Sequence, residues 1–565
     1  MAFETHFGGT DFGGTGLAFS GGGPHSYLNA DARAGATDNG KPSFTIDQAA
    51  SRLTGDQAGW GGVLGGSTTV TYAFRSTQPA VMPTDTAGFS RFNDAQIIQA
   101  ELAMTGWSDV ANITFVRVGS GTFGEAAFSD DASMLLGNYF SGEDGAVAFA
   151  YFPGSRSANA RAGDIWVNNS FDYNAAPDVG GYGGLTIVHE IGHAIGLDHP
   201  SDYDAAGNDT LTYSLHASYY EDSRQYTVMS YFGGFNTGAN LPGYSAAPLL
   251  DDIAAAQEEY GANMSTRTGD TVYGFNSNAN RPWYLLTSNA TKAQFAVWDA
   301  GGNDTFDFSG YSSSQVIELR QGFFSDVGGN RGNVAIAKGA DIENAIGGSG
   351  SDSITGNALN NQLEGGGGND TVLGGAGSDT ITDSSGANYL RGDEGNDALV
   401  GGSGFDDING NMGNDTASGG GGNDWVVGGK DNDLLYGDGG NDLVYGNLGN
   451  DTCDGGVGAD TVRGGQGEDS LTGQAGDDWL SGDRGNDTIS GGSGADIFHS
   501  FADAGVDRVL DFNRLEGDRV LLDVGTIYQV SQVGSDVVIN MDGGGQLILV
   551  GVQQSSLSPG WITVG

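Results

Sequence analysis

The stretch VHEIGHAIGLDHP, residues 188–200, decides how the rest of the sequence is interpreted. Residues four apart on a helix share one face, so His189 and His193 can direct both imidazoles at one metal ion. Glu190 is close enough to reach a water on that metal. Gly196 can adopt the left-handed conformation that ends the helix and turns the chain, which brings His199 back as a third ligand. Three neutral imidazoles leave a position open for water, which is the arrangement of a catalytic zinc site.

The histidine count supports this interpretation. The chain has only seven histidines, and three of them fall within eleven residues at ligand spacing. Two alternatives are a helix with ordinary histidines and a closed structural zinc site. Structural zinc sites usually use cysteine, and Cys453 is the single cysteine of the chain. The spacing therefore favours a catalytic metal centre.

The spacing H-E-x-x-H-x-x-G-x-x-H is the metzincin signature. The segment YTVMSYF, residues 226–232, resembles the Met-turn that lies under the zinc in that group. Because Pro200 follows His199 and Met229 is followed by Ser-Tyr, the chain resembles the serralysins, a family of secreted bacterial zinc proteases. The resemblance implies structural roles for Met229 and Gly196. It also implies that Tyr231 is a further, displaceable zinc ligand that stabilises the oxyanion during catalysis.

The composition excludes several classes of partner. The net charge is −49, from 71 acidic and 22 basic residues, which argues against nucleic acid or an anionic membrane as the main partner. One cysteine excludes an internal disulfide framework. The first twenty residues lack the basic and apolar regions of a secretory signal, and no apolar run of about eighteen residues predicts a membrane helix.

The second half of the chain is a repeat. From Gly347 to His499 it runs in 17 nonapeptides of the pattern G-G-x-G-x-D-x-U-x, with Asp at the sixth position in 15 of them and Asn in two. The eighth position is apolar in all 17. This pattern predicts a parallel β-roll in which Asp side chains and carbonyls bind Ca²⁺. A disordered acidic linker is the alternative, but a linker needs no inward apolar side chain.

The predicted calcium ligands of the repeat are the sixth-position aspartates. They are Asp352, Asp370, Asp379, Asp397, Asp406, Asp415, Asp424, Asp433, Asp442, Asp451, Asp460, Asp469, Asp478, Asp487 and Asp496.

The resemblance implies further calcium sites where the protease joins the roll. The residues that match the family's ligands there are Arg267, Gly269, Thr271, Asp299, Gly301, Gly302, Asp304, Asp341 and Glu343. The family usually has Thr where this chain has Asp341, a departure that keeps oxygen ligation possible.

Several segments of the N-terminal half have the patterns of regular structure. Residues 92–107 have a helical apolar stripe with Ser90 as the expected N-cap, and a second helix is expected from Pro248 to Tyr260, ended by Gly261. Residues 146–152 are typical of a strand. The resemblance places Ala148, Phe149 and Ala150 on an edge strand that pairs with the substrate backbone, while an ordinary sheet strand fits the sequence equally well.

We therefore expect an α+β metzincin protease domain followed by a mostly-β parallel β-roll. The expected parts are a prosegment and flexible N-terminal region (1–40), a zinc metalloprotease catalytic domain (41–262), a junction with calcium sites (263–346), the nonapeptide roll (347–499), and an end cap with a C-terminal secretion signal (500–565).

The expected function is that of a secreted, extracellular zinc endopeptidase that hydrolyses protein or peptide substrates with a Glu190-activated water and is stabilised by several calcium ions. The resemblance implies export by type I machinery and leaves a protein inhibitor open. We expect a monomer without membrane insertion. The rival hypothesis is a calcium-dependent surface or matrix protein whose protease domain is vestigial. The complete set of His189, Glu190, His193, His199 and Tyr231 argues against that decay.

Overall fold

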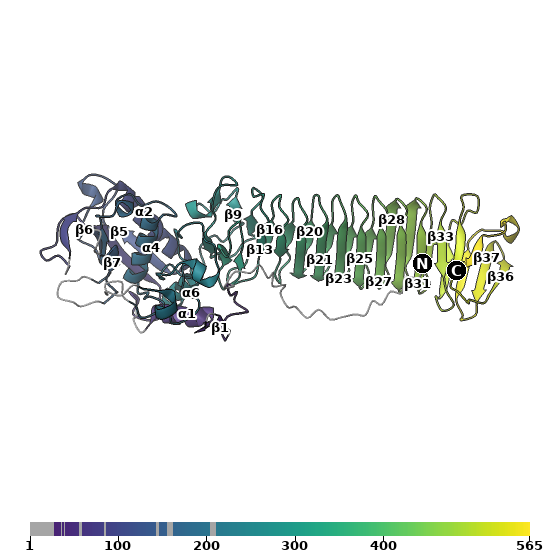
Figure 1. Ribbon diagram of the computed structural model, residues 1–565, viewed down its shortest axis with the longest axis horizontal. Coiled ribbons are helices and arrows are strands. Elements are labelled where there is room, and N and C mark those ends of the chain that lie inside the picture. Colours follow the sequence, from purple (N-terminus) through teal and green to yellow (C-terminus); the bar gives the residue numbers. More distant parts are fainter. Residues whose placement is uncertain are drawn as a thin grey trace.

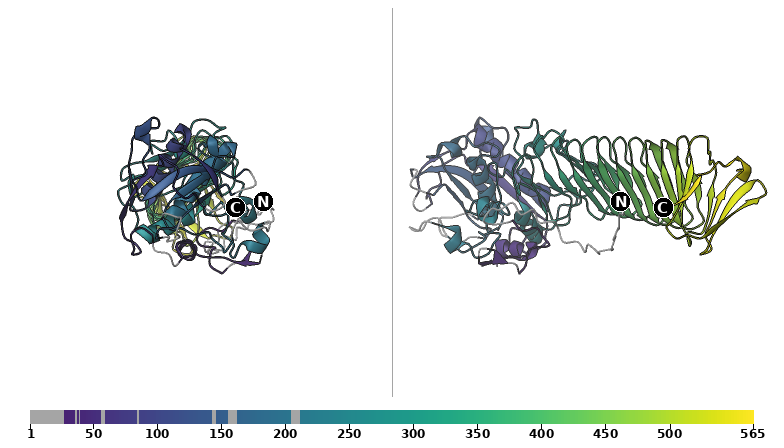
Figure 2. Two further views of the ribbon diagram at one scale, coloured as in Figure 1. Left: turned by 90° about the vertical axis from the view of Figure 1, so that its left-hand side faces the viewer. Right: turned by 45° about the vertical axis from the view of Figure 1, so that its right-hand side comes forward.

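The computed structural model describes residues 27–35, 37–38, 40–55, 59–83, 86–142, 146–154, 162–203 and 211–565. The molecule is elongated: a domain of mixed helices and strands leads into a long stack of short strands (Figure 1). The right-hand view of Figure 2 shows the strands side by side along the long axis, with the N-terminal domain at one end. The predicted fold class, an α+β domain followed by a parallel β-roll, is confirmed.

The N-terminal domain is built on a six-stranded sheet in the order β5-β3-β6-β8-β7, with β4 paired to β6. The strands are β3 (Thr68–Phe74), β4 (Ala87–Ser90), β5 (Ile113–Arg117), β6 (Met134–Phe140), β7 (Ala148–Ala150) and β8 (Ile165–Asn168). Neighbouring strands are parallel, except that β7 is antiparallel to β8 and β4 is antiparallel to β6. β7 therefore forms one edge of this sheet.

Six α-helices accompany this sheet in the described chain: α1 (Ile46–Thr54), α2 (Asp94–Val110), α3 (Asp172–Ala175), α4 (Tyr182–Ala194), α5 (Tyr213–His216) and α6 (Leu250–Tyr260). α2 begins later than predicted, because Asn93 and not Ser90 forms the capping box: its side chain accepts from the Gln96 backbone N–H at 3.0 Å. α6 begins two residues after Pro248, where the Asp252 carboxylate accepts from the Leu249 N–H at 2.9 Å.

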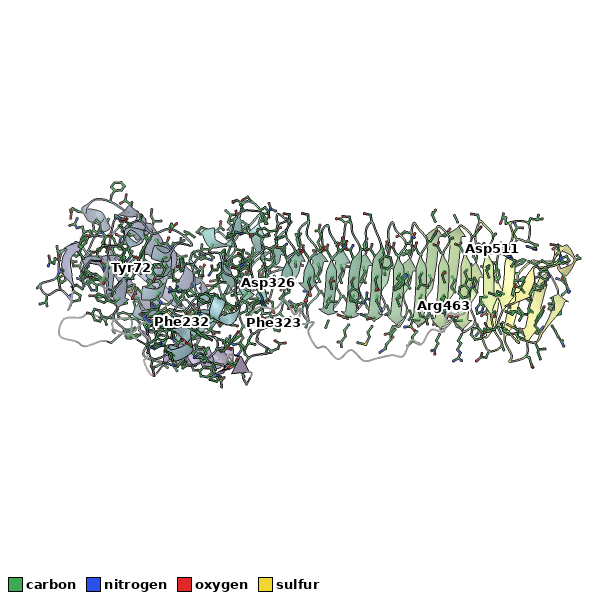
Figure 3. The ribbon with its side chains drawn as sticks, in the orientation of Figure 1. Tyr72, Phe232, Phe323, Asp326, Arg463 and Asp511 are labelled. Atoms are coloured by element: carbon green, nitrogen blue, oxygen red, sulfur yellow. The ribbon has the colours of Figure 1, made fainter. Side chains whose placement is uncertain are left out.

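Residues 27–35 are docked against the protease domain, which differs from the predicted flexible region of residues 1–40. The Arg33 guanidinium donates to both oxygens of Asp251, at 2.8 and 2.9 Å, and both side chains are fully buried. The Tyr27 hydroxyl donates to Asp326 at 2.9 Å, at the place where the domain meets the roll (Figure 3). Composition alone suggested no core here, but a buried ion pair fixes the segment. The rest of residues 1–40, except 37–38 and 40, lies outside the described residues.

The roll consists of two long sheets whose strands alternate along the chain. The first, in spatial order, contains β10 (Leu285–Leu286), β9 (Val272–Phe275), β12 (Thr305–Asp307), β16 (Asn344–Ile346), β18 (Gln362–Glu364), β20 (Thr380–Thr382), β22 (Ala398–Val400), β24 (Thr416–Ser418), β26 (Leu434–Tyr436), β28 (Thr452–Val457), β30 (Ser470–Ala475), β32 (Thr488–Ser490), β34 (Val506–Val509), β38 (Gln546–Leu549), β37 (Asp536–Met541) and β36 (Tyr528–Val533). The second contains β13 (Val316–Glu318), β17 (Ser353–Thr355), β19 (Thr371–Ala376), β21 (Asn388–Glu394), β23 (Asp406–Met412), β25 (Trp425–Lys430), β27 (Leu443–Leu448), β29 (Thr461–Gln466), β31 (Trp479–Arg484), β33 (Ile497–Ser500), β35 (Arg519–Leu522) and β39 (Ile562–Val564).

Two small sheets complete the strand inventory of the described residues: β1 (Thr37–Asp38) with β2 (Lys41–Pro42), and β11 (Phe295–Val297) with β15 (Val334–Ile336) and β14 (Phe324–Ser325).

Each coil of the roll is two nonapeptides long, because strands pair with the strand 18 residues later, as Ile354 does with Val372. The eighth-position side chains fill the space between the two sheets and are at most 1% exposed. The inward position of Cys453, itself 1% exposed, follows this rule. The stacking also extends beyond residues 347–499 on both sides, from β9 to β39, since backbone pairing continues where the nonapeptide pattern stops. Among the described residues, no helix has the length and apolar character needed to cross a bilayer.

Candidate active site

Helix α4 and the turn after it bring the three histidines together. The helix ends at Ala194, Gly196 takes a φ of +111°, and the Leu197 N–H donates back to the Gly192 carbonyl at 2.9 Å. This turn reverses the chain and returns His199 to the helix. A ligand nitrogen of each of His189, His193 and His199 lies within 4.8 Å of the others. The group fits a zinc site with three imidazole ligands.

Backbone carbonyls orient two of the imidazoles. The Nδ1 atom of His189 lies 2.9 Å from the Val228 carbonyl, and that of His193 lies 2.7 Å from the Leu197 carbonyl. A carbonyl only accepts, so each Nδ1 carries the proton and each Nε2 keeps its lone pair for a metal. Burial lowers the pKa of all three rings, that of His199 to about 3. The imidazoles are therefore neutral, which is the form that binds metal.

Glu190 is buried beside this group. Its Oε2 atom has no hydrogen-bond partner among the described residues. Burial raises the pKa of the Glu190 carboxyl to about 8, and a nearby cation would lower it again. A carboxyl group with one unpartnered oxygen, in the lining of the same cavity as His189, is suited to proton transfer at neutral pH.

The segment Tyr226–Tyr231 passes directly under α4. A Cβ atom at Gly192 would lie 2.6 Å from the Met229 sulfur, so the close approach of this segment requires glycine in the helix. The Tyr231 ring stacks 5.7 Å from the His189 ring and lies 4.6 Å from that of His199. Met229 therefore packs against α4 at Gly192, and Tyr231 lies beside the three histidines.

Asp252 of α6 fixes this turn from the other side. Its carboxylate accepts from the Thr227 hydroxyl at 2.5 Å and from the Val228 N–H at 2.7 Å. The Thr227 hydroxyl oxygen in turn accepts from the Met229 N–H at 2.9 Å. The sequence analysis did not identify Asp252. Its only sequence signal was an acidic residue in the first turn of a predicted helix, which ordinarily indicates capping.

A cavity of about 300 Å³ opens beside the histidines. It lies between the chain around β7, helix α4 and the segment that carries Tyr231. Ala148 lines this cavity, and β7 pairs with β8 along one of its edges. Of the three predicted substrate-strand residues, Ala148 is thus at the cavity, while the Phe149 ring packs against those of Tyr139 and Tyr151 and Ala150 continues the strand.

The aspartates of the roll form two continuous columns. From Asp352 to Asp478 the backbone N–H of each sixth-position residue donates to Oδ1 of the residue 18 positions later, as Asp415 does to Asp433 at 2.9 Å. Asp487 and Asp496 donate instead to Asp507 and Asp518. The second oxygen, Oδ2, is buried and has no partner among the described residues in all the predicted aspartates except Asp352, whose Oδ2 accepts from the Gly348 N–H at 2.6 Å. Burial raises the pKa of many of these carboxyls, that of Asp433 to about 7. Regularly spaced, unpartnered carboxylate oxygens are the donors that Ca²⁺ prefers.

The comparisons with known proteins agree with both halves. A family model described as Peptidase M10 serralysin C terminal matches residues 262–549, and a model described as Matrixin matches residues 67–223. The chain belongs to the serralysin family. Metalloprotease AprA of Pseudomonas entomophila is 48% identical to it over 344 residues, which are 59% of this chain and 68% of that protein. Metallopeptidase AprA of Pseudomonas marginalis is 49% identical over 57% of this chain and 67% of that protein, and Serralysin C of Dickeya chrysanthemi is 50% identical over 56% and 65%. This serralysin is a metalloendopeptidase.

The predicted junction ligands of this serralysin are partly brought together. The Asp304 N–H donates to Glu343 at 2.7 Å, and Asp304 Oδ1 accepts from the Thr271 N–H at 2.7 Å. Asp304 Oδ2 is buried and unpartnered. Gly302 lies against the carbonyl of Gly269, which a Cβ would approach to 2.8 Å. This group offers carboxylate and carbonyl oxygens in one place.

The other predicted junction ligands have different surroundings. Asp341 is exposed and accepts from the Gln321 amide at 2.6 Å. The Arg267 side chain pairs with Asp109 at 3.0 Å. Asp299 accepts from Tyr273 at 2.5 Å, and its other oxygen accepts from the Gly301 N–H at 2.9 Å. The Asp341 carboxylate is thus already paired by an amide.

Asp383 was also missed by the sequence analysis. It replaces the first glycine of the nonapeptide whose sixth position is Asn388. Asp383 Oδ2 is buried and unpartnered, as is Oδ2 of Asp370, and a Cβ at Gly365 would meet both atoms. Asn388 directs its amide Nδ2 to the Gly401 carbonyl at 3.3 Å. Asp383 at position one therefore supplies the carboxylate that Asn388 lacks at position six. The sequence indicates this only when both departures from the nonapeptide pattern are considered together.

Proposed function

We propose that this serralysin is a secreted zinc-dependent endopeptidase that hydrolyses extracellular proteins by attack of a Glu190-activated water. The observation that carries the proposal is an unpartnered Glu190 oxygen in a residue that lines the same cavity as His189, one of three histidines whose ligand nitrogens converge. His189, His193 and His199 would hold Zn²⁺, which supplies Lewis-acid polarisation of a carbonyl and acidifies water.

Glu190 would act as the proton shuttle. Its free oxygen would accept a proton from the attacking water and later give it to the leaving amine. The carboxylate is buried, so bulk water does not compete for that oxygen, and the cavity beside it provides room for the peptide.

The substrate backbone would pair with the edge strand β7. The strand has β8 on one side only, so its other edge has main-chain groups available to an extended peptide. Ala148 would then face the cavity wall next to the scissile bond, with Phe149 and Ala150 continuing the pairing. Main-chain pairing gives affinity without requiring particular side chains, which suits a protease of broad tolerance.

Calcium would hold the roll and the junction. The unpartnered Oδ2 atoms of the roll, together with Asp304 and Glu343, support several structural Ca²⁺ sites. We further propose a prosegment within residues 1–40 and export by type I machinery through a signal within 500–565. Casein zymography with and without a chelator tests the proteolytic function. A clear band lost with chelator and restored by Zn²⁺ together with Ca²⁺ is expected. A chelated sample that stays active contradicts the zinc-dependent mechanism, whereas a metal-loaded sample that gives no band favours the rival surface protein.

Replacing Tyr231 with phenylalanine should lower kcat by about a hundredfold to a thousandfold, roughly 3 kcal/mol, because one oxyanion donor is lost. The phenylalanine ring keeps the stacking on His189 and His199. KM and zinc content should therefore change little. Steady-state kinetics on one peptide and metal analysis of the purified variant check this; an unchanged kcat would show that the hydroxyl does not act on the oxyanion.

A further inference from the structure

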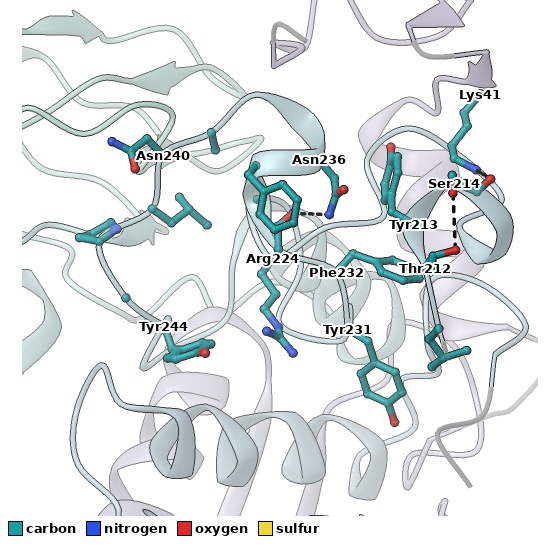
Figure 4. Close-up of a pocket in the computed structure, with 18 residues that line it drawn as sticks. Lys41, Thr212, Tyr213, Ser214, Arg224, Tyr231, Phe232, Asn236, Asn240 and Tyr244 are labelled. Carbon is teal, nitrogen blue, oxygen red and sulfur yellow. Dashed lines mark hydrogen bonds between the residues drawn. The ribbon is translucent and has the colours of Figure 1, made fainter. Parts of the chain in front are cut away.

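Arg224 lines the cavity beside the histidines. Its backbone N–H donates to the Phe232 carbonyl at 2.8 Å and its Nε–H to the Ser230 carbonyl at 3.1 Å. These bonds tie it to the segment that carries Tyr231. Figure 4 shows Arg224 reaching toward the helix with Tyr244 and Tyr231 on either side. The side chain lines this cavity and also an adjoining open one of about 1050 Å³.

The guanidinium of Arg224 lies near two aromatic rings. Its centre lies 5.6 Å from the Tyr182 ring and 5.6 Å from the Tyr244 ring. Within the described chain no Asp or Glu forms an ion pair with it, and its terminal nitrogens keep donors to offer. Other arginines of the N-terminal domain are paired with carboxylates: Arg33, Arg52, Arg75, Arg91 and Arg117.

The surroundings of Arg224 are unusual for this chain. The protein carries a net charge of −49, yet among the described residues that line the two cavities Glu190 is the only acid. The larger cavity has Lys41 as a second cation. The smaller cavity also has apolar side chains in its lining, among them Val147, Leu185 and Val228. A side chain with an apolar stem and an anionic end therefore matches the cavity.

We propose that Arg224 is a specificity-determining residue that selects an acidic side chain, Asp or Glu, at one position next to the scissile bond. The inference rests on the proposed peptide hydrolysis. A peptide paired along β7 would place one side chain in the cavity, and its carboxylate would accept hydrogen bonds from the terminal nitrogens of Arg224. Because Arg224 is half-buried, its hydrogen bonds to a substrate carboxylate should favour Glu strongly over the uncharged Gln.

The test maps cleavage sites in a denatured protein mixture by mass spectrometry, with wild type, Arg224→Lys and Arg224→Met. Both variants lose the Nε–H bond to Ser230, but only methionine loses the charge, so lysine is the matched control. We expect Asp and Glu to be enriched at one position beside the cleaved bond for wild type and Arg224→Lys. The kcat/KM ratio for paired Glu and Gln peptides should fall about tenfold or more in Arg224→Met. It should also fall with salt in the wild type.

The outcomes separate two failures. If no bond is cleaved, the proposed proteolysis fails; if bonds are cleaved without acidic enrichment in the wild type, only the role of Arg224 fails. Cleavage at a fixed distance from substrate C-termini, whatever the side chain, would also overturn the inference, because Arg224 would then bind a terminal carboxylate. An Arg224→Met enzyme that keeps the acidic preference would assign it to another group.

Discussion

Glu190→Ala should bind as much zinc as the wild type and lose peptide hydrolysis, with kcat lower by about a hundredfold to ten-thousandfold. The histidine nitrogens converge without help from Glu190, and two of the rings are held by carbonyls of Val228 and Leu197. The zinc site should therefore survive the substitution. The attacking water, however, would have no nearby base.

The same variant should not be less stable than the wild type. Glu190 Oε2 is buried without a partner in the described structure, and removing an unsatisfied buried group costs little. Metal analysis, thermal unfolding and kcat on one peptide check the three expectations. Glu258→Ala is the matched control, since Glu258 lies on α6 outside the cavity lining and accepts only from Ser51 at 3.1 Å. Near wild-type turnover of Glu190→Ala would refute the role of this carboxylate.

The three-histidine cluster could be predicted from the sequence because its geometry depends on residues that are close together in the chain. Helix periodicity places His189 and His193, and one glycine turn returns His199, all within one short segment. The inward eighth positions of the roll are predictable for the same reason, since one unit determines its neighbour. Two of the features that the sequence analysis missed join separate elements of the chain. Asp252, on α6, accepts a hydrogen bond from the Val228 N–H of the segment under α4. Arg33 pairs with Asp251, which is 218 residues away in the sequence.

The extent of the roll was harder to predict than its centre. Pattern recognition requires the nonapeptide, whereas stacking requires only backbone pairing and a buried side chain. Thus Tyr273 and Phe306 are fully buried and paired in β9 and β12 although no repeat is visible there. The sequence could not assign a role to Arg224. The residues around an arginine in the sequence do not show whether its guanidinium pairs with a carboxylate in the folded protein.

Calcium should be the folding switch of the roll. Successive aspartates lie one coil apart, as Asp415 and Asp433 do, and strands in a sheet are about 4.8 Å apart. Without cations, like charges in a buried column repel one another, and ordering the glycine-rich coils costs further entropy. With Ca²⁺ the unpartnered oxygens become ligands, so binding free energy becomes folding free energy. A chain that stays extended at low calcium would also pass a narrow exporter.

The measurement uses the full chain as Glu190→Ala, which prevents self-cleavage, and starts in chelator at pH 8. Hydrogen exchange of residues 424–470 and the hydrodynamic radius are followed while calcium is added. Protection and compaction should appear with Ca²⁺ but not with Na⁺ of equal ionic strength; a roll already protected in chelator would refute the switch.

Acid should partly replace calcium in the same protein. Burial raises the folded-state pKa of Asp433, Asp442 and Asp478 to about 7, above the ordinary Asp value. Between about pH 4 and 7 the folded roll then binds more protons than the unfolded chain, so the stability of the calcium-free roll falls as pH rises through this window. Lowering the pH of the chelated protein from 8 to 5 should therefore increase protection of residues 424–470. At pH 5 the same protons compete with Ca²⁺, so the calcium midpoint should rise. A chelated roll whose protection is unchanged between pH 5 and 8 would show that carboxylate repulsion is not what keeps it unfolded.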